Sequence, residues 1–238
     1  MTMNTTTLYQ HGTLALLVPG LLTGTLPMRT LLAHGDTGIG TGEGLDGELI
    51  ILDGKPYQVN SDGKVTVVGD DFTLPFANSH FADYRPLLTV ENATREEVHD
   101  QVLALTHGAN TFFSIMVTGT FTDVKTRAVA KSSRPFKSLA ETAENQSIFT
   151  RDTVKGTLLG YYSPQIFDGV AVGGYHDHFL DDDHTFGGHL LGCGRVTGEV
   201  QVQIFDTLEQ HLPVDDTDYQ QHDFSQDDIM GDLHQAEG

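Results

Sequence analysis

Four histidines lie within one short segment, residues 174–189, of a chain of 238 residues. On a strand, His176 and His178 are two residues apart and therefore point to the same face, while Asp177 faces away. The stretch that follows is rich in Asp and Gly, which favour a chain reversal that returns His189 to the same place. Three neutral imidazoles with open positions are typical of a catalytic zinc site, and they suit Zn, Cu, Fe or Ni better than Mg or Ca.

A solvated strand face is the alternative interpretation of His176 and His178 alone. The return to His189 across two glycines favours the metal site over that alternative. His184, in the middle of the turn, is expected to be a solvated loop residue. Nearby carboxylates are expected to hold the imidazole N–H groups of the ligands.

A second candidate feature is the glycine-rich run at residues 35–44, which ends close to Glu48. The run follows a helix end, and its spacing fits neither the Walker motif nor Gly-x-Gly-x-x-Gly, so a phosphate loop is not expected. Glycines here would let the backbone line a pocket or cross closely packed strands. Glu48 alternates with the apolar Leu49, so it either faces a cavity or lies at the edge of a turn.

Composition limits the partners of the chain. It has 13 Lys and Arg against 33 Asp and Glu, a formal charge of −20, which disfavours nucleic acid and membrane surfaces as partners. A single cysteine, Cys193, excludes an internal disulfide and a thiolate zinc site and is expected to be a small buried hydrophobe.

The apolar stretch 14–22 is too short and too interrupted for a signal peptide or a membrane span, so a cytoplasmic protein is predicted. The acidic tail after Arg195 contains no Lys or Arg and reads as a solvated terminus.

The pattern of apolar residues predicts a mixture of strands and short helices. Thr94 with Glu97 forms a capping box for a helix that ends at His107-Gly108. A first helix has Pro27 in its first turn. The other expected elements are a buried strand at 13–18, strands over 49–53, 57–60, 65–68, 72–76, 87–90 and 112–121, a short helix at 139–144, and strands at 147–150, 157–162, 175–180 and 196–205.

The helix that begins near Pro27 and the helix that begins at Thr94 end in similar short sequences, Thr30-Leu-Leu-Ala-His-Gly35 and Leu103-Ala-Leu-Thr-His-Gly108. The order strand, helix, strand meander also occurs twice. These features predict an α/β (α+β) fold in which two similar β-α-β-meander halves form mixed sheets in a compact single unit. The first half is residues 1–84, and the second, residues 85–238, carries the metal site and the acidic tail.

Four stretches resemble a known family: Leu-Asp-Gly-Glu48, Val124-Lys-Thr-Arg127, Gly156-Thr-Leu-Leu-Gly-Tyr-Tyr-Ser-Pro164, and Gly174-Tyr-His-Asp-His-Phe179 with Phe186-Gly-Gly-His189. Over nearly its whole length the chain is similar to α-acetolactate decarboxylases. The resemblance implies a zinc ion bound by His176, His178 and His189. It also implies that Glu48, Arg127, a pocket threonine at Thr41 and a C-terminal glutamate, best matched by Glu237, surround the ion.

The activity that the resemblance implies is conversion of 2-acetolactate to acetoin and CO₂, which would supply acetoin and butanediol formation. Zinc would act as a Lewis acid that stabilises an enediolate, and protonation would then be stereoselective. Arg127 would hold the substrate carboxylate and Glu48 would donate the proton, with Glu237 as metal ligand or proton shuttle. No organic cofactor is expected. The family is commonly dimeric, so a homodimer is expected.

Two alternatives remain at this point. A cupin-like metal-dependent oxygenase also uses His-x-His with a later His, but it expects a glutamate shortly after the second His, where this chain has Asp182 and Asp183. The other alternative is a non-catalytic small-ligand or DNA-associated binding module on the same fold. The charge of −20 disfavours DNA, and the three histidines would then have no role.

Overall fold

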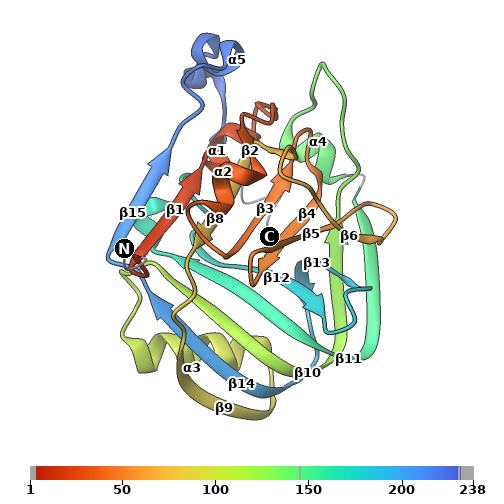
Figure 1. Cartoon of the computed structure of the whole chain (residues 1–238), viewed down its shortest axis with the longest axis vertical. Coiled ribbons are helices and arrows are strands. Elements are labelled where there is room, and N and C mark those ends of the chain that lie inside the picture. Colours follow the sequence, from red (N-terminus) through yellow and green to blue (C-terminus); the bar gives the residue numbers. More distant parts are fainter. Residues whose placement is uncertain (1–3, 145, 230, 232–238) are drawn as a thin grey trace.

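Two β-sheets pack against each other in a computed structural model of the chain, which describes residues 4–144, 146–229 and 231 (Figure 1). The first sheet has seven strands. Only the pairing of its first two strands is parallel, so the sheet is mixed, as predicted. Its order is β15 (Thr207–His211), β1 (Thr7–His11), β8 (Phe76–His80), β3 (Thr37–Gly42), β4 (Asp46–Leu52), β5 (Lys55–Val59) and β6 (Val65–Val67).

The second sheet is antiparallel throughout and has six strands, two of them long and curved. Its order is β11 (Ser147–Ser163), β12 (Gly174–Asp181), β13 (Gly187–Gly192), β10 (Phe113–Ala128), β14 (Val196–Ile204) and β9 (Arg85–Ala93). Because β10 also pairs with β11, strands β10 to β13 form a closed ring of pairings. Strands β12 and β13 therefore each have a hydrogen-bonded neighbour on both sides.

Helices are few in the described part of the chain, and two of them, α2 and α3, cover the outer faces of the two sheets. The chain forms α1 (Leu14–Leu17), α2 (Met28–Leu32), α3 (Arg95–Thr106), α4 (Leu139–Ala143) and α5 (Thr217–Gln221), with 3₁₀ turns at Gln165–Phe167 and Phe224–Gln226 and a ribbon of β2 (Leu26–Pro27) and β7 (Thr73–Leu74). Apolar residues of α2 pack on the first sheet and those of α3 on the second. The capping box of Thr94 and Glu97 begins α3, and the left-handed residue His107 ends it, as predicted.

The sequence prediction is wrong in one place that matters for the site. Residues 13–18 do not form a strand: the strand lies earlier, at Thr7–His11, and Leu14–Leu17 form α1. The expected strands at 147–150 and 157–162 are a single strand, β11. In addition, β15 pairs with β1 in the first sheet although it follows β14 of the second sheet along the chain.

Alternation along the strands directs one set of side chains into the space between the sheets. In β4, Ile50 lies in the core shared by the two sheets, whereas Leu49 and Ile51 pack on the other side with α2. In β12, Leu180 lies in the shared core, and Phe179 packs on the side of α3. Residues two or four positions before Ile50 and Leu180 therefore also face the space between the sheets.

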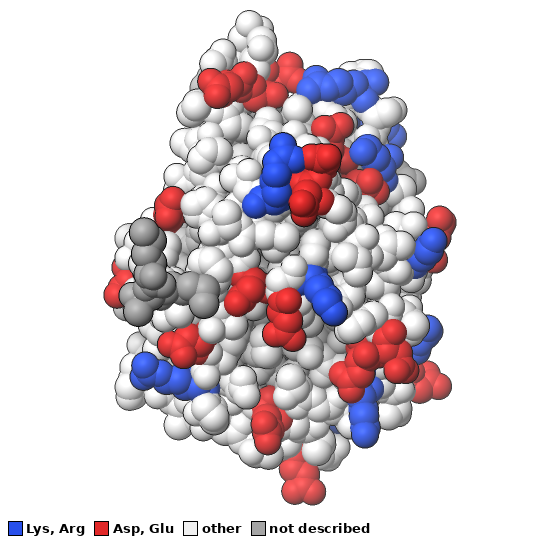
Figure 2. Space-filling model, in the orientation of Figure 1, with Lys and Arg blue, Asp and Glu red and all other residues white. Residues whose placement is uncertain are grey.

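Figure 2 shows acidic and basic side chains interspersed over one face, with no continuous basic area on it. Among the described residues, no helix is both long and apolar enough to cross a membrane.

The central part of the glycine-rich run, Thr37–Gly42, forms β3, a fully buried strand between β4 and β8. A Cβ atom at Gly38 would lie 2.2 Å from the carbonyl oxygen of Asn78 and 3.3 Å from Cα of Ser79. The expectation that these glycines allow close packing of strands is confirmed at this position.

We predict that Gly38→Ala destabilises the protein by about 1–3 kcal/mol because the added methyl group has no space against the backbone of β8. Gly69→Ala is the control, since a Cβ there meets no atom within 4 Å. Denaturant unfolding of both variants measures the effect. Equal midpoints for the two variants would contradict the account of β3.

Candidate active site

The three predicted ligands meet on the inner face of the second sheet. His178 in β12 pairs directly with His189 in β13, and His176 lies two residues earlier on the same face of β12. One nitrogen from each ring lies within 4.8 Å of the other two. Among the described residues they are the one group of His, Cys, Asp or Glu side chains arranged in this way.

The spacing of the ring nitrogens fits a shared metal ion. His176 Nε2 and His189 Nδ1 are 3.1 Å apart. Two nitrogens bound tetrahedrally to one zinc ion at about 2.0–2.1 Å would lie about 3.3–3.4 Å apart. The rings are tilted or edge-on to one another, with interplanar angles of 51–70°, so they converge without stacking.

His178 is oriented by the opposite sheet. Its Nδ1 lies 3.0 Å from the carbonyl oxygen of Leu49 in β4. A carbonyl only accepts, so Nδ1 carries the proton and Nε2 keeps its lone pair. This Nε2 is buried, makes no hydrogen bond among the described residues, and lies 3.5 Å from the carboxylate of Glu48. A buried imidazole nitrogen with a lone pair and no donor is suited to a metal ion.

The site favours the neutral form of the His178 and His189 imidazoles, the form that metal ligation requires. Burial is the main cause that lowers the pKa of His178 and of His189 well below the usual value of 6.5. The charge of Arg127 acts in the same direction on both rings and is the second-largest cause for His189. Protons therefore compete weakly with a metal near neutral pH.

The first sheet brings Thr41 and Glu48 to the same cavity. They pair directly across β3 and β4, and Glu48 lies two residues before the inward-facing Ile50, which confirms that it faces a cavity. The Thr41 hydroxyl donates to the carbonyl oxygen of Gly47 at 2.7 Å, which fixes the turn before Glu48.

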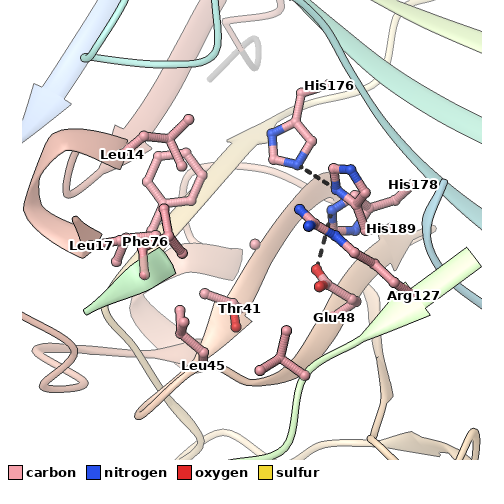
Figure 3. Close-up of a pocket in the computed structure, with 13 residues that line it drawn as sticks. Leu14, Leu17, Thr41, Leu45, Glu48, Phe76, Arg127, His176, His178 and His189 are labelled. Atoms are coloured by element: carbon pink, nitrogen blue, oxygen red, sulfur yellow. Dashed lines mark hydrogen bonds and ion pairs between the residues drawn. The ribbon is translucent and has the colours of Figure 1, made fainter. Parts of the chain in front are cut away.

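Arg127 comes from β10, where it pairs directly with His189. Its side chain is buried, and one guanidinium nitrogen donates to Gln146 Oε1 at 3.2 Å. The pocket therefore has a polar side made of three imidazoles, one carboxylate, one hydroxyl and one guanidinium group (Figure 3).

The opposite side of the pocket is an apolar wall that sequence reasoning missed. It consists of Leu14, Leu17, Leu45, Phe76, Val129 and Leu139. The spacing of Leu14 and Leu17, three residues apart, was the available signal for a helix face. The continuous apolar run around them concealed that signal and favoured a strand.

Three other predicted residues lie outside this pocket or outside the described structure. His184 is exposed on the turn after β12, where its ring lies 4.4 Å from that of Tyr57. Cys193 is half-buried, and burial raises the pKa of its thiol to about 11, which agrees with a packing role. Glu237 lies outside the described residues.

Comparison with known proteins identifies one family. A family model described as alpha-acetolactate decarboxylase matches residues 8–226. Among curated proteins of that name, the one from Lactococcus lactis subsp. cremoris is 38% identical over 98% of both chains. The one from Streptococcus thermophilus is 40% identical over 97% of this chain and 98% of its own.

Solved structures show the same fold. The alpha-acetolactate decarboxylase of Bacillus subtilis superposes with a TM-score of 0.91 at 31% identity, covering 98% of this chain and 99% of its own. A Staphylococcus aureus protein, described as of unknown function and similar to alpha-acetolactate decarboxylase, gives 0.92 at 32% identity over 97% of this chain and all of its own.

The three-histidine geometry predicts that the protein binds one equivalent of Zn²⁺ and that His176→Ala lowers the affinity at least tenfold, since one of three imidazole ligands is lost. His184→Ala is the matched control, a histidine of the same segment that lies outside the pocket. Titration of the metal-free protein against a chromophoric chelator measures both. Equal affinities for the two variants would contradict the assignment.

Proposed function

Because the chain belongs to the alpha-acetolactate decarboxylase family, and is therefore a carboxy-lyase, we propose that it converts 2-acetolactate to acetoin and CO₂ with a zinc ion held by His176, His178 and His189. The observation that carries the proposal is the convergence of three imidazoles, Arg127 and Glu48 on one pocket. A divalent metal bound there supplies a Lewis acid that polarises the substrate ketone, where electron density collects as CO₂ leaves.

Arg127 binds the substrate carboxylate. Its guanidinium group is buried beside His189 and offers planar, paired donors that match a carboxylate. When Arg127 holds the carboxylate, the carbon–carbon bond that will break aligns with the π system of the neighbouring ketone. The electrons of this bond then pass to the ketone oxygen. Gln146 limits the freedom of the guanidinium by accepting one of its hydrogen bonds.

Glu48 supplies the proton that replaces CO₂ on carbon. It approaches from the first sheet, whereas Arg127 and the histidines belong to the second, so the proton reaches one face of the planar enediolate. Its carboxyl group lies 3.5 Å from His178 Nε2, and this distance supports a proton donor adjacent to the proposed metal position. Glu237 remains the second carboxylate of the proposal, as metal ligand or proton shuttle.

The apolar wall receives the methyl groups of the substrate. Leu14 and Leu17 of α1 and Leu139 of α4 close the side of the pocket that faces away from the histidines. An apolar wall on one side and polar groups on the other orient a small molecule that has both kinds of group. The wall also excludes water, which strengthens the electrostatic interactions of Arg127.

The proposal is favoured over both alternatives raised by the sequence. Asp182 and Asp183, which occupy the positions where a cupin-like oxygenase would have a further ligand, are exposed on a turn and do not line the pocket. A binding module without metal would leave His178 Nε2 buried with no hydrogen bond among the described residues, at a desolvation cost of about 1–3 kcal/mol.

We predict that the purified protein forms acetoin from racemic 2-acetolactate faster than spontaneous decay, that chelation abolishes the excess rate, and that Zn²⁺ restores it. Colorimetric detection of acetoin and chiral chromatography of the product measure rate and stereochemistry. Acetoin formation no faster than decay would refute the proposed reaction. Oxygen consumption during turnover would favour the oxygenase instead.

We expect Glu48→Gln to retain zinc while kcat falls about 10²- to 10⁴-fold or enantioselectivity is lost, because the amide cannot donate the required proton. Glu209→Gln, at an exposed position of β15, is the control and should leave the reaction unchanged. Metal content is determined alongside the kinetics. Unaltered turnover and product handedness in Glu48→Gln would rule out its role as proton donor.

A further inference from the structure

The pairing between the two ligand-bearing strands ends at the site itself. Strands β12 and β13 pair at Leu180–Gly187, Phe179–Gly188 and His178–His189. The pair of the two histidines is the last of these three. His176 lies beyond the end of this pairing, although its Nε2 is 3.1 Å from His189 Nδ1. Beyond this point His176 pairs with Tyr161 of β11 and β13 pairs with β10, so contacts other than the direct β12–β13 pairing contribute to the separation of His176 and His189.

Arg95 of α3 bridges the two strands on the opposite face of the sheet. Its guanidinium Nη1 donates to the carbonyl oxygen of Leu190, the residue after His189, at 3.3 Å. The same nitrogen lies 4.0 Å from the carboxylate of Asp177. One guanidinium group thus touches the neighbour of a ligand on each strand at the point where they stop pairing.

Asp177 is buried between β12 and α3, where its carboxylate faces Arg95 and His99. Its side chain is 2% exposed, and its Oδ2 lies 3.1 Å from Nε2 of His99, one turn after Arg95 on the same face of α3. The opposing position on β11 is Gly160, where a Cβ atom would lie 2.2 Å from Asp177 Oδ1, so a larger residue there would require the carboxylate to move.

Tyr175 completes the contact between α3 and β12. Its ring stacks on that of His99 with centroids 3.7 Å apart and an interplanar angle of 9°. Its hydroxyl donates to the backbone carbonyl of His99 at 3.0 Å. Two successive outward-facing residues of β12, Tyr175 and Asp177, which flank His176, are therefore both attached to α3.

We propose that Arg95, His99 and Asp177 form a positioning cluster that sets the separation of the imidazoles of His176 and His189 and thereby the affinity and geometry of the metal site, an inference that rests on the proposed metal centre. None of the three residues lines the pocket. Their effect passes through the backbones of β12 and β13. Groups that hydrogen-bond directly to metal-ligating side chains are worth about 10- to 100-fold in metal affinity, and for contacts that act through the ligand strands we expect the lower end of that range.

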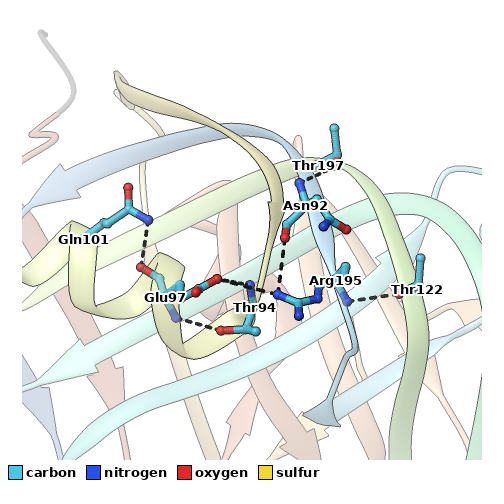
Figure 4. Close-up of polar contacts among 7 residues, drawn as sticks. All are labelled: Asn92, Thr94, Glu97, Gln101, Thr122, Arg195 and Thr197. Carbon is cyan, nitrogen blue, oxygen red and sulfur yellow. Dashed lines mark hydrogen bonds and ion pairs between the residues drawn. The ribbon is translucent and has the colours of Figure 1, made fainter.

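The chain offers a matched control on the same helix. Arg195 contacts the first turn of α3, with Nη1 at 3.4 Å from the carbonyl of Asn92 and at 3.8 Å from the carboxylate of Glu97 (Figure 4). It thus has the same two kinds of partner as Arg95, a carbonyl and a carboxylate. Neither partner belongs to β12 or β13, so Arg195 supports α3 without touching the ligand strands.

The test compares Arg95→Met and Arg195→Gln with the unaltered full-length protein. Zn²⁺ affinity is measured by chelator competition, the visible spectrum is recorded with Co²⁺ in place of zinc, and the metal-free proteins are unfolded in denaturant. We expect Arg95→Met to raise the Zn²⁺ dissociation constant at least tenfold and to change the Co²⁺ spectrum. Arg195→Gln should bind within twofold of the unaltered protein with the same spectrum.

Two further variants keep the test decisive if Arg95→Met fails to fold. Arg95→Lys retains a cation that reaches one of the two strands, and its Zn²⁺ dissociation constant should lie between twofold and tenfold above that of the unaltered protein. Asp177→Asn removes the charge that faces Arg95 and His99 but keeps the size of the side chain, and it should also raise the dissociation constant more than twofold.

Three results would overturn the inference. Zn²⁺ binding by Arg95→Met, or by both milder variants, within twofold of the unaltered protein would show that the cluster does not position the ligands. An unchanged Co²⁺ spectrum with a lowered unfolding midpoint would show that Arg95 only stabilises the fold. Absence of Zn²⁺ binding by the unaltered protein would instead refute the metal centre itself, together with the cluster's role.

Discussion

The hydrogen bond from His178 Nδ1 to the carbonyl oxygen of Leu49 is the contact on which the site depends. It joins β12 of one sheet to β4 of the other, and it fixes which nitrogen of the ring faces the pocket. The residue before Leu49 is Glu48, so the same contact sets the distance between the carboxylate and the imidazole. A relative shift of the sheets would break this bond and leave a buried donor and a buried acceptor without partners, which is costly.

Burial of the ligands carries a free-energy cost that the rest of the fold offsets. His178 and His189 are nearly inaccessible to solvent, and Arg127 beside them is 7% exposed. Burial of polar groups with incomplete hydrogen bonding disfavours folding. Two extensive apolar cores, one between the sheets and one under α3, supply the opposing hydrophobic term. The closed ring of strands β10 to β13 gives each ligand strand two neighbours, so the costly arrangement is also rigid.

The sequence was informative where local rules decide the structure. The capping box at Thr94 and the alternation that places His176 and His178 on one face depend on residues close together in the chain, and both were predicted correctly. The strand expected at 13–18 was wrong because an apolar run of this length fits a buried strand as well as a helix. The contacts of Asp177 with α3 were not predictable, since they depend on how a distant helix packs on the sheet. Tertiary packing of this kind leaves no local signal.

The net charge of −20 does not by itself determine how an anionic substrate interacts with this pocket. A chain with so many carboxylates would repel an anionic substrate if all charges acted equally. Surface carboxylates are screened by salt within about 8–10 Å, whereas a charge in a buried site interacts through a medium of lower dielectric constant. Arg127 is buried at the pocket, and its charge already lowers the pKa of His189. In the proposed reaction, this one buried guanidinium and the metal therefore determine the potential that the substrate carboxylate meets, and the acidic surface contributes little to it.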